Sequence, residues 1–232
     1  AAGLAVSEGM RSQIRGMNVA SRNAQDGISM MQVADGALGT VGDMLQRVRD
    51  LAVQASNGTL TDAQRKNLDI EVQQILSEVG KNGTDTEFNG VKILAGSVAT
   101  AASAVTLQVG ANASQNIAFT IGTVSASDLG ISGIAVSSAA SASAAIASLD
   151  AAINTVTTAR ANLGAIQNRL ESTINRLGVT AENVQAAESR IRDADMAQEM
   201  IQFTKNQILQ QSGTAMLAQA NQAPQSILSL LR

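Results

Sequence analysis

The feature that most constrains this chain is a heptad repeat of small and apolar residues near its start. Steps of four and three residues separate Met10, Ile14, Met17, Ser21, Ala24, Ile28 and Met31, and then Ala34, Leu38, Val41, Leu45, Val48 and Ala52. This spacing keeps one stripe of a helix facing a partner helix. A second consecutive step of three, from Met31 to Ala34, should shift the stripe locally. We expect one long helix that ends near Ser56-Asn57-Gly58.

The core of such a chain must be built from aliphatic side chains, because the 232 residues include no Cys, His, Trp or Tyr and only three Phe. Small residues favour helices that pack closely on one another. The six glycines of the first helix are either close-approach points or are merely tolerated: Gly9, Gly16, Gly27, Gly36, Gly39 and Gly42.

The composition also restricts the chemistry. Without Cys and His there is no thiol nucleophile, no imidazole base and no Cys/His zinc site, so only a carboxylate-based active site remains possible. Asp193, Asp195 and Glu199 lie two and four residues apart, so they do not all share one helix face, and we interpret them as solvated charges. We expect no enzyme activity, no cofactor and no metal.

Partners of some kinds are disfavoured as well. The net charge is −3, and no basic patch with interleaved aromatic residues indicates nucleic-acid binding. No apolar run is long enough to predict a membrane span, and no signal peptide opens the chain. The chain begins inside a helical pattern without an N-cap, which we interpret as a helix that has lost upstream residues.

A second helix is predicted from Thr61-Asp62-Ala63-Gln64, which has the capping-box pattern. Its apolar stripe consists of Leu68, Val72, Ile75 and Val79. Gly80, Asn82-Gly83 and Asn89-Gly90 are expected to break the chain into turns after it.

The middle of the chain changes to Ala, Ser, Thr and Gly from Ser97 to Ala145. Within it, Val105–Val109 and Ile117–Ile121 predict two strands joined through Gly110-Ala111-Asn112 as a hairpin. Ile117, Phe119 and Ile121 should share one face of the second strand. The Ala/Ser run from Ser137 to Ser148 is either a linker or the start of a helix.

Helical spacing then returns and continues to the end of the chain. Leu163, Ile166, Leu170, Ile174 and Leu177 repeat at three and four, and Gly178 is expected to break or kink this helix. Pro224 marks either a kink or a first-turn position near the end. The N-terminal and C-terminal parts each carry an apolar stripe that has to be buried against another helix. The predicted fold is therefore mainly α, a long antiparallel, coiled-coil-like helical rod with a small β-hairpin region.

Several blocks of the chain resemble one family. The start, AAGLAVSEGMRSQIRGMNVASRNAQDGISMMQVADGAL, is similar to the N-terminal helix of bacterial flagellins, and LQRVRDLAVQ and TEFNG are similar to the next two blocks of that family. LGAIQNRL, AESRIRDAD and MLAQANQAPQ, followed by a final LLR, resemble its C-terminal half. The blocks cover the chain except roughly Gly122 to Ala152.

The resemblance implies an arrangement of parts. Residues 1–96 would be the N-terminal helices of a rod-like core domain, 97–145 its hairpin and variable linker region, 146–196 its C-terminal helix, and 197–232 a terminal helix of the inner filament layer. Flagellins carry a further N-terminal stretch that partners this last helix, and we expect it to be absent here. We also expect no large outer domain, because only the hairpin and an Ala/Ser stretch occupy its place.

The resemblance further implies a function and partners. The chain would assemble with other flagellin subunits into the extracellular flagellar filament for swimming, exported by the flagellar route with a chaperone on its C-terminal segment. The residues expected to contact that chaperone and the filament core are Ile201, Phe203, Ile208, Leu209, Met216, Leu217, Leu228 and Leu231. An animal Toll-like receptor would recognise the core-domain surface at Arg47, Leu51 and Glu71, the first two sharing a helix face at a spacing of four.

Two alternatives stay open at this point. A hook-filament junction protein, or another coiled-coil adaptor, shares the helical ends but not the internal blocks. Some relatives of flagellin carry a protease domain in the middle region, but its metal motif needs paired His, and this chain has none.

Overall fold

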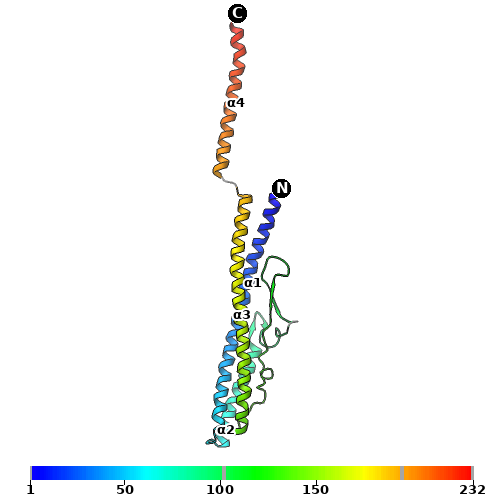
Figure 1. Cartoon of the computed structure of the whole chain (residues 1–232), viewed down its shortest axis with the longest axis vertical. Coiled ribbons are helices and arrows are strands. Elements are labelled where there is room, and N and C mark those ends of the chain that lie inside the picture. The colour runs from blue at the N-terminus through cyan, green and yellow to red at the C-terminus, as the bar shows by residue number, and fades with distance from the viewer. Residues whose placement is uncertain (1, 101–102, 194–195, 231–232) are drawn as a thin grey trace. The chain divides into compact units, whose positions relative to one another are not determined.

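The computed structural model describes residues 2–100, 103–193 and 196–230 (Figure 1). The described elements are, in order, α1 Ala2–Ala55, α2 Asp62–Asp85, β1 Glu87–Phe88, β2 Val91–Lys92, β3 Val105–Gln108, β4 Asn116–Phe119, α3 Ala139–Arg192 and α4 Met196–Leu230. They fall into two compact units. One unit is Gly9–Gln185, and the other combines residues 1–8 with residues 186–232.

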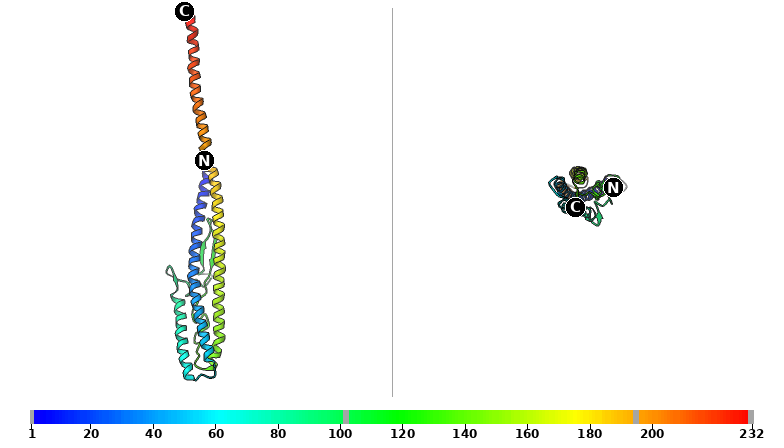
Figure 2. Two further views of the ribbon diagram at one scale, coloured as in Figure 1. Left: turned by 90° about the vertical axis from the view of Figure 1, so that its left-hand side faces the viewer. Right: turned by 90° about the horizontal axis from the view of Figure 1, so that it is seen from below.

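The unit Gly9–Gln185 is a helical rod in which α1 and α3 run antiparallel. Arg49 of α1 pairs with Asp150 of α3 at 2.7 Å, whereas Asp35, earlier in α1, pairs with Arg160, later in α3, at 2.8 Å. Figure 2 shows α2 beside the same two helices. The mainly α fold with a small β region, expected from the two helical ends, is confirmed.

The heptad stripe of α1 is the centre of the rod. From Ala34 to Ala52 every residue of the predicted stripe has 0% exposure. At the predicted phase slip the adjacent Met30 and Met31 are both buried, so the buried stripe changes its position on the helix there. The helix ends at Ala55, where Ser56-Asn57-Gly58 was expected to stop it.

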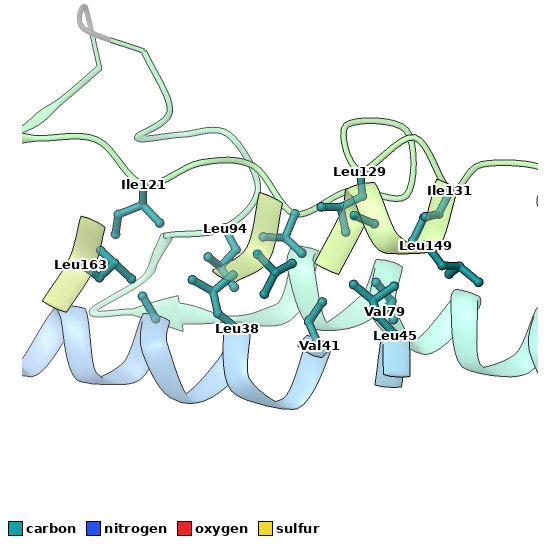
Figure 3. Close-up of a cluster of buried hydrophobic side chains, with 14 of the residues drawn as sticks. Leu38, Val41, Leu45, Val79, Leu94, Ile121, Leu129, Ile131, Leu149 and Leu163 are labelled. Carbon is teal, nitrogen blue, oxygen red and sulfur yellow. The ribbon is translucent and has the colours of Figure 1, made fainter. Parts of the chain in front are cut away.

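The core also takes in a segment without regular secondary structure. In Figure 3, Leu38, Val41 and Leu45 of α1 lie in one cluster with Leu149 and Leu163 of α3, and the loop residues Ile121, Leu129 and Ile131 lie across the cluster from α1. Between β4 and α3 the buried apolar residues recur every few positions: Ile121, Val124, Leu129, Ile131, Ile134 and Val136. This stretch therefore closes the core along one side of the helices.

The predicted hairpin is present, and a second one accompanies it. β3 and β4 pair antiparallel with Val105 opposite Phe119 and Leu107 opposite Ile117. Ile117, Phe119 and Ile121 are all buried, as their alternation predicted. The strands β1 and β2 were not predicted.

The turn between β1 and β2 uses Asn89-Gly90, which have φ of 51° and 76°. Both residues lie in the left-handed region, which Gly and Asn tolerate best.

Three of the expected breaks are wrong. The helix α2 continues through Gly80 and Asn82-Gly83 to Asp85, and α3 continues through Gly178 to Arg192. Packing holds these helices together where the intrinsic preference of glycine is unfavourable. Gly83 in addition lies directly under the carbonyl oxygen of Val124, a position that no side chain could share.

Two further features settle open points. The Ala/Ser run is the start of a helix, since α3 begins at Ala139. Pro224 lies inside α4 and not in its first turn.

Two of the six glycines of α1 are close-approach points. A Cβ on Gly16 would stand 2.9 Å from the Cβ of Ala111, and a Cβ on Gly27 would meet the side chain of Leu107. Both neighbours belong to the β3–β4 hairpin region, so these two glycines let it lie against α1. Gly9 and Gly36 have nothing within 4 Å.

Candidate interaction surfaces

The helix α4 exposes large apolar side chains. Six of the expected anchor residues have described side chains, and their exposure runs from 57% for Ile208 to 73% for Met216. The six are Ile201, Phe203, Ile208, Leu209, Met216 and Leu217. Leu228 lies within α4, but its side chain is outside the described residues, as is the whole of Leu231.

The apolar residues of α4 are not confined to one face. With about 3.6 residues per turn, Ile201 and Ile208 lie on one side of the helix and Phe203 and Leu217 near the other. On the first side a groove is lined by Met200, Ile201, Thr204, Lys205, Ile208 and Leu209. A helix that is apolar all round is normally buried. The surface of α4 therefore suits cover from more than one direction.

The second expected surface, on α1 and α2, is only partly exposed. Arg47 donates from Nε and Nη2 to the Oε1 of Glu71 at 3.1 and 2.7 Å. The two side chains are 58% and 42% exposed. Leu51 is 2% exposed and belongs to the core. Arg47 and Leu51 lie four residues apart on α1, but Leu51 is covered by other segments and so does not contribute to the exposed surface at Arg47.

An arginine that the sequence reading missed joins α1 to α2. Arg65 is 7% exposed, and its guanidinium donates to the carbonyl oxygens of Ala55 and Asn57 and to the carboxylate of Asp62. It thereby satisfies a carbonyl group left free at the end of α1. Nothing in the heptad pattern distinguishes this arginine from a solvated one.

The helices are also joined by two exposed ion pairs. The hydrogen bond from Arg49 to Asp150 raises the pKa of the Arg49 guanidinium, and the bond from Arg160 to Asp35 raises the pKa of Arg160. Both arginines stay charged at any physiological pH, and the two pairs mark the same antiparallel register of α1 against α3.

A cavity of about 430 Å³ lies beside the tip of the β3–β4 hairpin. It is lined by Met17 of α1, by residues 109–112 and 114–117 at the end of the hairpin, and by one face of α3. The α3 face contributes Arg169, Thr173 and Arg176, of which Thr173 is 7% exposed. Sequence reasoning did not single out this place, because it depends on where the hairpin lies against the helices.

Among the described residues no group of His, Cys, Asp and Glu has the arrangement of a metal site. Within the same residues, no helix combines the length and the apolar character that crossing a membrane requires.

Comparison with known proteins places the chain. The model of the bacterial flagellin N-terminal helical region matches residues 1–99, and that of the C-terminal helical region matches residues 146–231. Flagellin FlaB2 of Treponema pallidum is 50% identical, covering 100% of this chain and 85% of that protein. Flagellin of Bacillus subtilis is 48% identical, with coverage of 100% and 86%.

The chain belongs to the bacterial flagellin family. Flagellins are structural filament proteins and not enzymes, in agreement with the prediction from composition. Between β2 and α3 the described part of this flagellin contains only the β3–β4 hairpin and loops.

Solved structures agree with this assignment. The crystal structure of Bacillus cereus flagellin has a TM-score of 0.58 and 31% identity, covering 72% of this chain and 94% of that one. A flagellar hook-associated protein from Vibrio parahaemolyticus has a TM-score of 0.65 at 13% identity, which shows a shared fold alone. The sequence identities therefore favour flagellin over the junction-protein alternative.

Proposed function

We propose that this flagellin is a subunit of the flagellar filament and that α4 is covered there by helices of its own and neighbouring copies. The observation that carries the proposal is that α4 is exposed and apolar on opposite sides, at Ile201 and Ile208 and at Phe203 and Leu217. Copies joined by an interface that does not close into a ring form an open helical array. In that role the protein works outside the cell, after export through the flagellar route.

Electron microscopy of a flagellin-deleted host tests this function. The chain would be expressed with the N-terminal flagellin segment restored, and long filaments and swimming are expected. Phe203→Asp with Leu217→Asp should abolish filaments, whereas Val179→Asp, on an exposed position of α3, should leave them intact. Short caps or no assembly by the unaltered chain would contradict the proposal and favour a junction protein.

We also propose that an export chaperone covers α4 before assembly. Exposed apolar side chains on a helix are a surface for a partner groove, and they favour premature association while they are open. Ile201, Ile208 and Leu209 lie along one groove of α4 and are the proposed anchors.

Binding of the flagellar export chaperone to the chain measures this directly. The full chain should bind, a chain that ends near Ala197 should not, and Ile201→Ala with Ile208→Ala should weaken binding strongly. Glu199→Ala, a polar change in the same helix, serves as the control. Undiminished affinity of the truncated chain would exclude the C-terminal segment as the chaperone site.

Recognition by an animal Toll-like receptor is a second proposed property, limited to the exposed pair on α1 and α2. Arg47 and Glu71 present a donor and an acceptor side by side, 2.7 Å apart. Leu51 supports this surface from beneath, since it is buried in the core.

A receptor-reporter assay separates surface contact from support. Arg47→Ala and Glu71→Ala should reduce activation without changing the thermal unfolding temperature. Leu51→Ala should lower both, as should Val48→Ala, a matched buried change in the same helix. Activation that is unchanged in Arg47→Ala and in Glu71→Ala would overturn the proposed site.

A further inference from the structure

Charge is unevenly distributed along the rod unit Gly9–Gln185. The part that contains residues 9–25, 108–116 and 164–185 has five arginines and two glutamates. The remaining residues of the unit have seven basic and twelve acidic side chains. Because Met17 and Ala20 pack with Leu177, and Gly16 lies against Ala111, the three segments form one end region of the unit. The rod thus has a basic end region and an acidic remainder.

The two arginines that α3 contributes to the basic region have no acidic partner in the described part of the chain. Arg169 and Arg176 are exposed, and no hydrogen bond or ion pair of either is found among the described residues. They lie seven residues apart on α3, which is about two turns or 10 Å along one face. Both line the cavity of about 430 Å³ beside the hairpin tip.

Thr173 adds a hydroxyl to the lining of this cavity. It lies between the two arginines, lines the same cavity and is only 7% exposed. Its hydroxyl has no hydrogen-bond partner among the described residues. Within the described residues no fully buried side-chain nitrogen or oxygen lacks a partner, so this hydroxyl reaches the open space of the cavity and can donate to an incoming acceptor.

A matching pair of carboxylates lies on α1. Asp43 and Asp50 are exposed, seven residues apart, and make no hydrogen bond or close ion pair in the described chain. Their charges act on Arg160 and Arg49, respectively, but these arginines are already bonded to Asp35 and Asp150. One heptad before Asp43, Gly36 is exposed with nothing within 4 Å, so this face of α1 is open to a neighbouring rod.

The two pairs of one copy cannot meet each other. Asp35 of α1 lies opposite Arg160 of α3, and this sets the level of the two helices relative to each other. At that register the arginine pair on α3 lies beside a part of α1 that precedes the aspartate pair by about 24 residues. The two pairs are therefore separated by roughly 36 Å along the rod, at 1.5 Å per residue. A second copy, parallel to the first and shifted by about that distance, brings them together. Because α1 and α3 are antiparallel, Asp43 then faces Arg176 and Asp50 faces Arg169.

We propose that the hairpin-tip cavity is a subunit-contact site, in which Arg169, Arg176 and the Thr173 hydroxyl receive Asp43 and Asp50 of a second, parallel copy. The arginines and the aspartates are each seven residues apart, so two charge-assisted bonds can form at the same time. Forming both bonds selects one axial offset between the two copies and excludes other offsets. This inference rests on the proposed filament function, and it assigns one contact between neighbouring subunits of the filament.

Charge reversal in filaments assembled with the N-terminal flagellin segment restored tests the pairing. Arg169→Glu with Arg176→Glu, or Asp43→Lys with Asp50→Lys, should raise the critical concentration for assembly at least about tenfold, equivalent to about 1.4 kcal/mol. An equimolar mixture of the two variants, and a chain that carries all four changes, should assemble close to the unaltered level. Circular dichroism checks that each variant folds. Asp85→Lys with Glu87→Lys, two exposed acids elsewhere in the unit, is the control and should assemble normally.

Cross-linking locates the contact independently. The chain has no cysteine, so Asp50→Cys with Arg169→Cys and Asp50→Cys with Arg176→Cys each provide two unique thiols for a short bismaleimide. The first combination should give a ladder of covalently joined copies in filaments, and the second, displaced by two turns, should give little.

The possible outcomes are distinct. Suppose that normal filaments form, that Asp50→Cys with Arg169→Cys gives no cross-linked ladder, and that mixing the two charge-reversed variants does not restore assembly. This result would overturn the proposed contact and leave the filament function standing. Failure of the unaltered chain to assemble would overturn the filament function and the contact with it.

Discussion

Leu107 of β3 occupies the space that a side chain on Gly27 of α1 would need. We predict that Gly27→Leu destabilises the rod by about 1–3 kcal/mol, the usual range for overpacking a filled site. Gly36→Leu, in the same helix with nothing within 4 Å, should be neutral or slightly stabilising. Urea unfolding followed by circular dichroism measures both. If Leu107 is the obstacle, adding Leu107→Ala to Gly27→Leu should cost less than the sum of the single changes.

A second pair of glycines in α2 should respond in opposite directions. Gly80 has nothing within 4 Å, so Gly80→Ala should stabilise the protein by about 0.5–1 kcal/mol through helix propensity. Gly83 faces the carbonyl oxygen of Val124, and the backbone of Val124 is held by a bond from its N–H to Leu94. Gly83→Ala should therefore destabilise by about 1–3 kcal/mol. Equal effects of the two changes on the unfolding midpoint would show that the loop around Val124 moves away to make room for the added methyl group.

The buried Arg65 gives a third prediction. Arg65→Met keeps much of the side-chain volume but removes the guanidinium from the buried carbonyl group of Ala55, whereas the exposed Asn57 carbonyl keeps the bond from the Leu60 N–H. A buried acceptor left unsatisfied costs about 1–3 kcal/mol, so the melting temperature should fall clearly. Lys66→Met removes an exposed neighbouring charge and should have little effect. A change no larger than that control would mean that water replaces the guanidinium.

The helices could be predicted because their signals are local. The steps of four and three from Met10 to Ala52 and the capping box at Thr61 depend on nothing outside their own segments, and α1 and α2 follow them closely. The breaks expected at Gly80 and Gly178 failed because packing against other segments outweighs an intrinsic preference of about 1 kcal/mol.

The surfaces were harder to predict because they depend on distant segments. Leu51 is buried by chain that the heptad pattern of α1 does not include, and the loop residues Ile121 and Ile131 carry no periodic signal although both enter the core. The apolar stretch of α4 could be seen in the sequence.

The ion pair between Asp35 and Arg160 should contribute little to stability. Its side chains are 39% and 48% exposed, so solvent screening limits the coupling to about 0.2–1 kcal/mol, falling in salt. A double-mutant cycle with Asp35→Asn and Arg160→Gln measures it. Because the pairing raises the pKa of Arg160, its contribution is fully present below the ordinary arginine value and is lost only above it. The coupling should therefore stay constant from about pH 7 to pH 10, and a change within that window would contradict the assignment.

The last prediction concerns α4 in the unassembled chain. Phe203 is 63% exposed, so Phe203→Asp should change the unfolding free energy by no more than about 0.5 kcal/mol, as surface substitutions usually do. Leu38→Ala, in the 0% exposed stripe of α1, should lose about 2–5 kcal/mol. The chain has no Trp or Tyr, so circular dichroism or calorimetry must replace fluorescence. A large loss in Phe203→Asp would mean that α4 is covered within a single copy, and the partner-binding role proposed for its exposed side chains would then lose its physical basis.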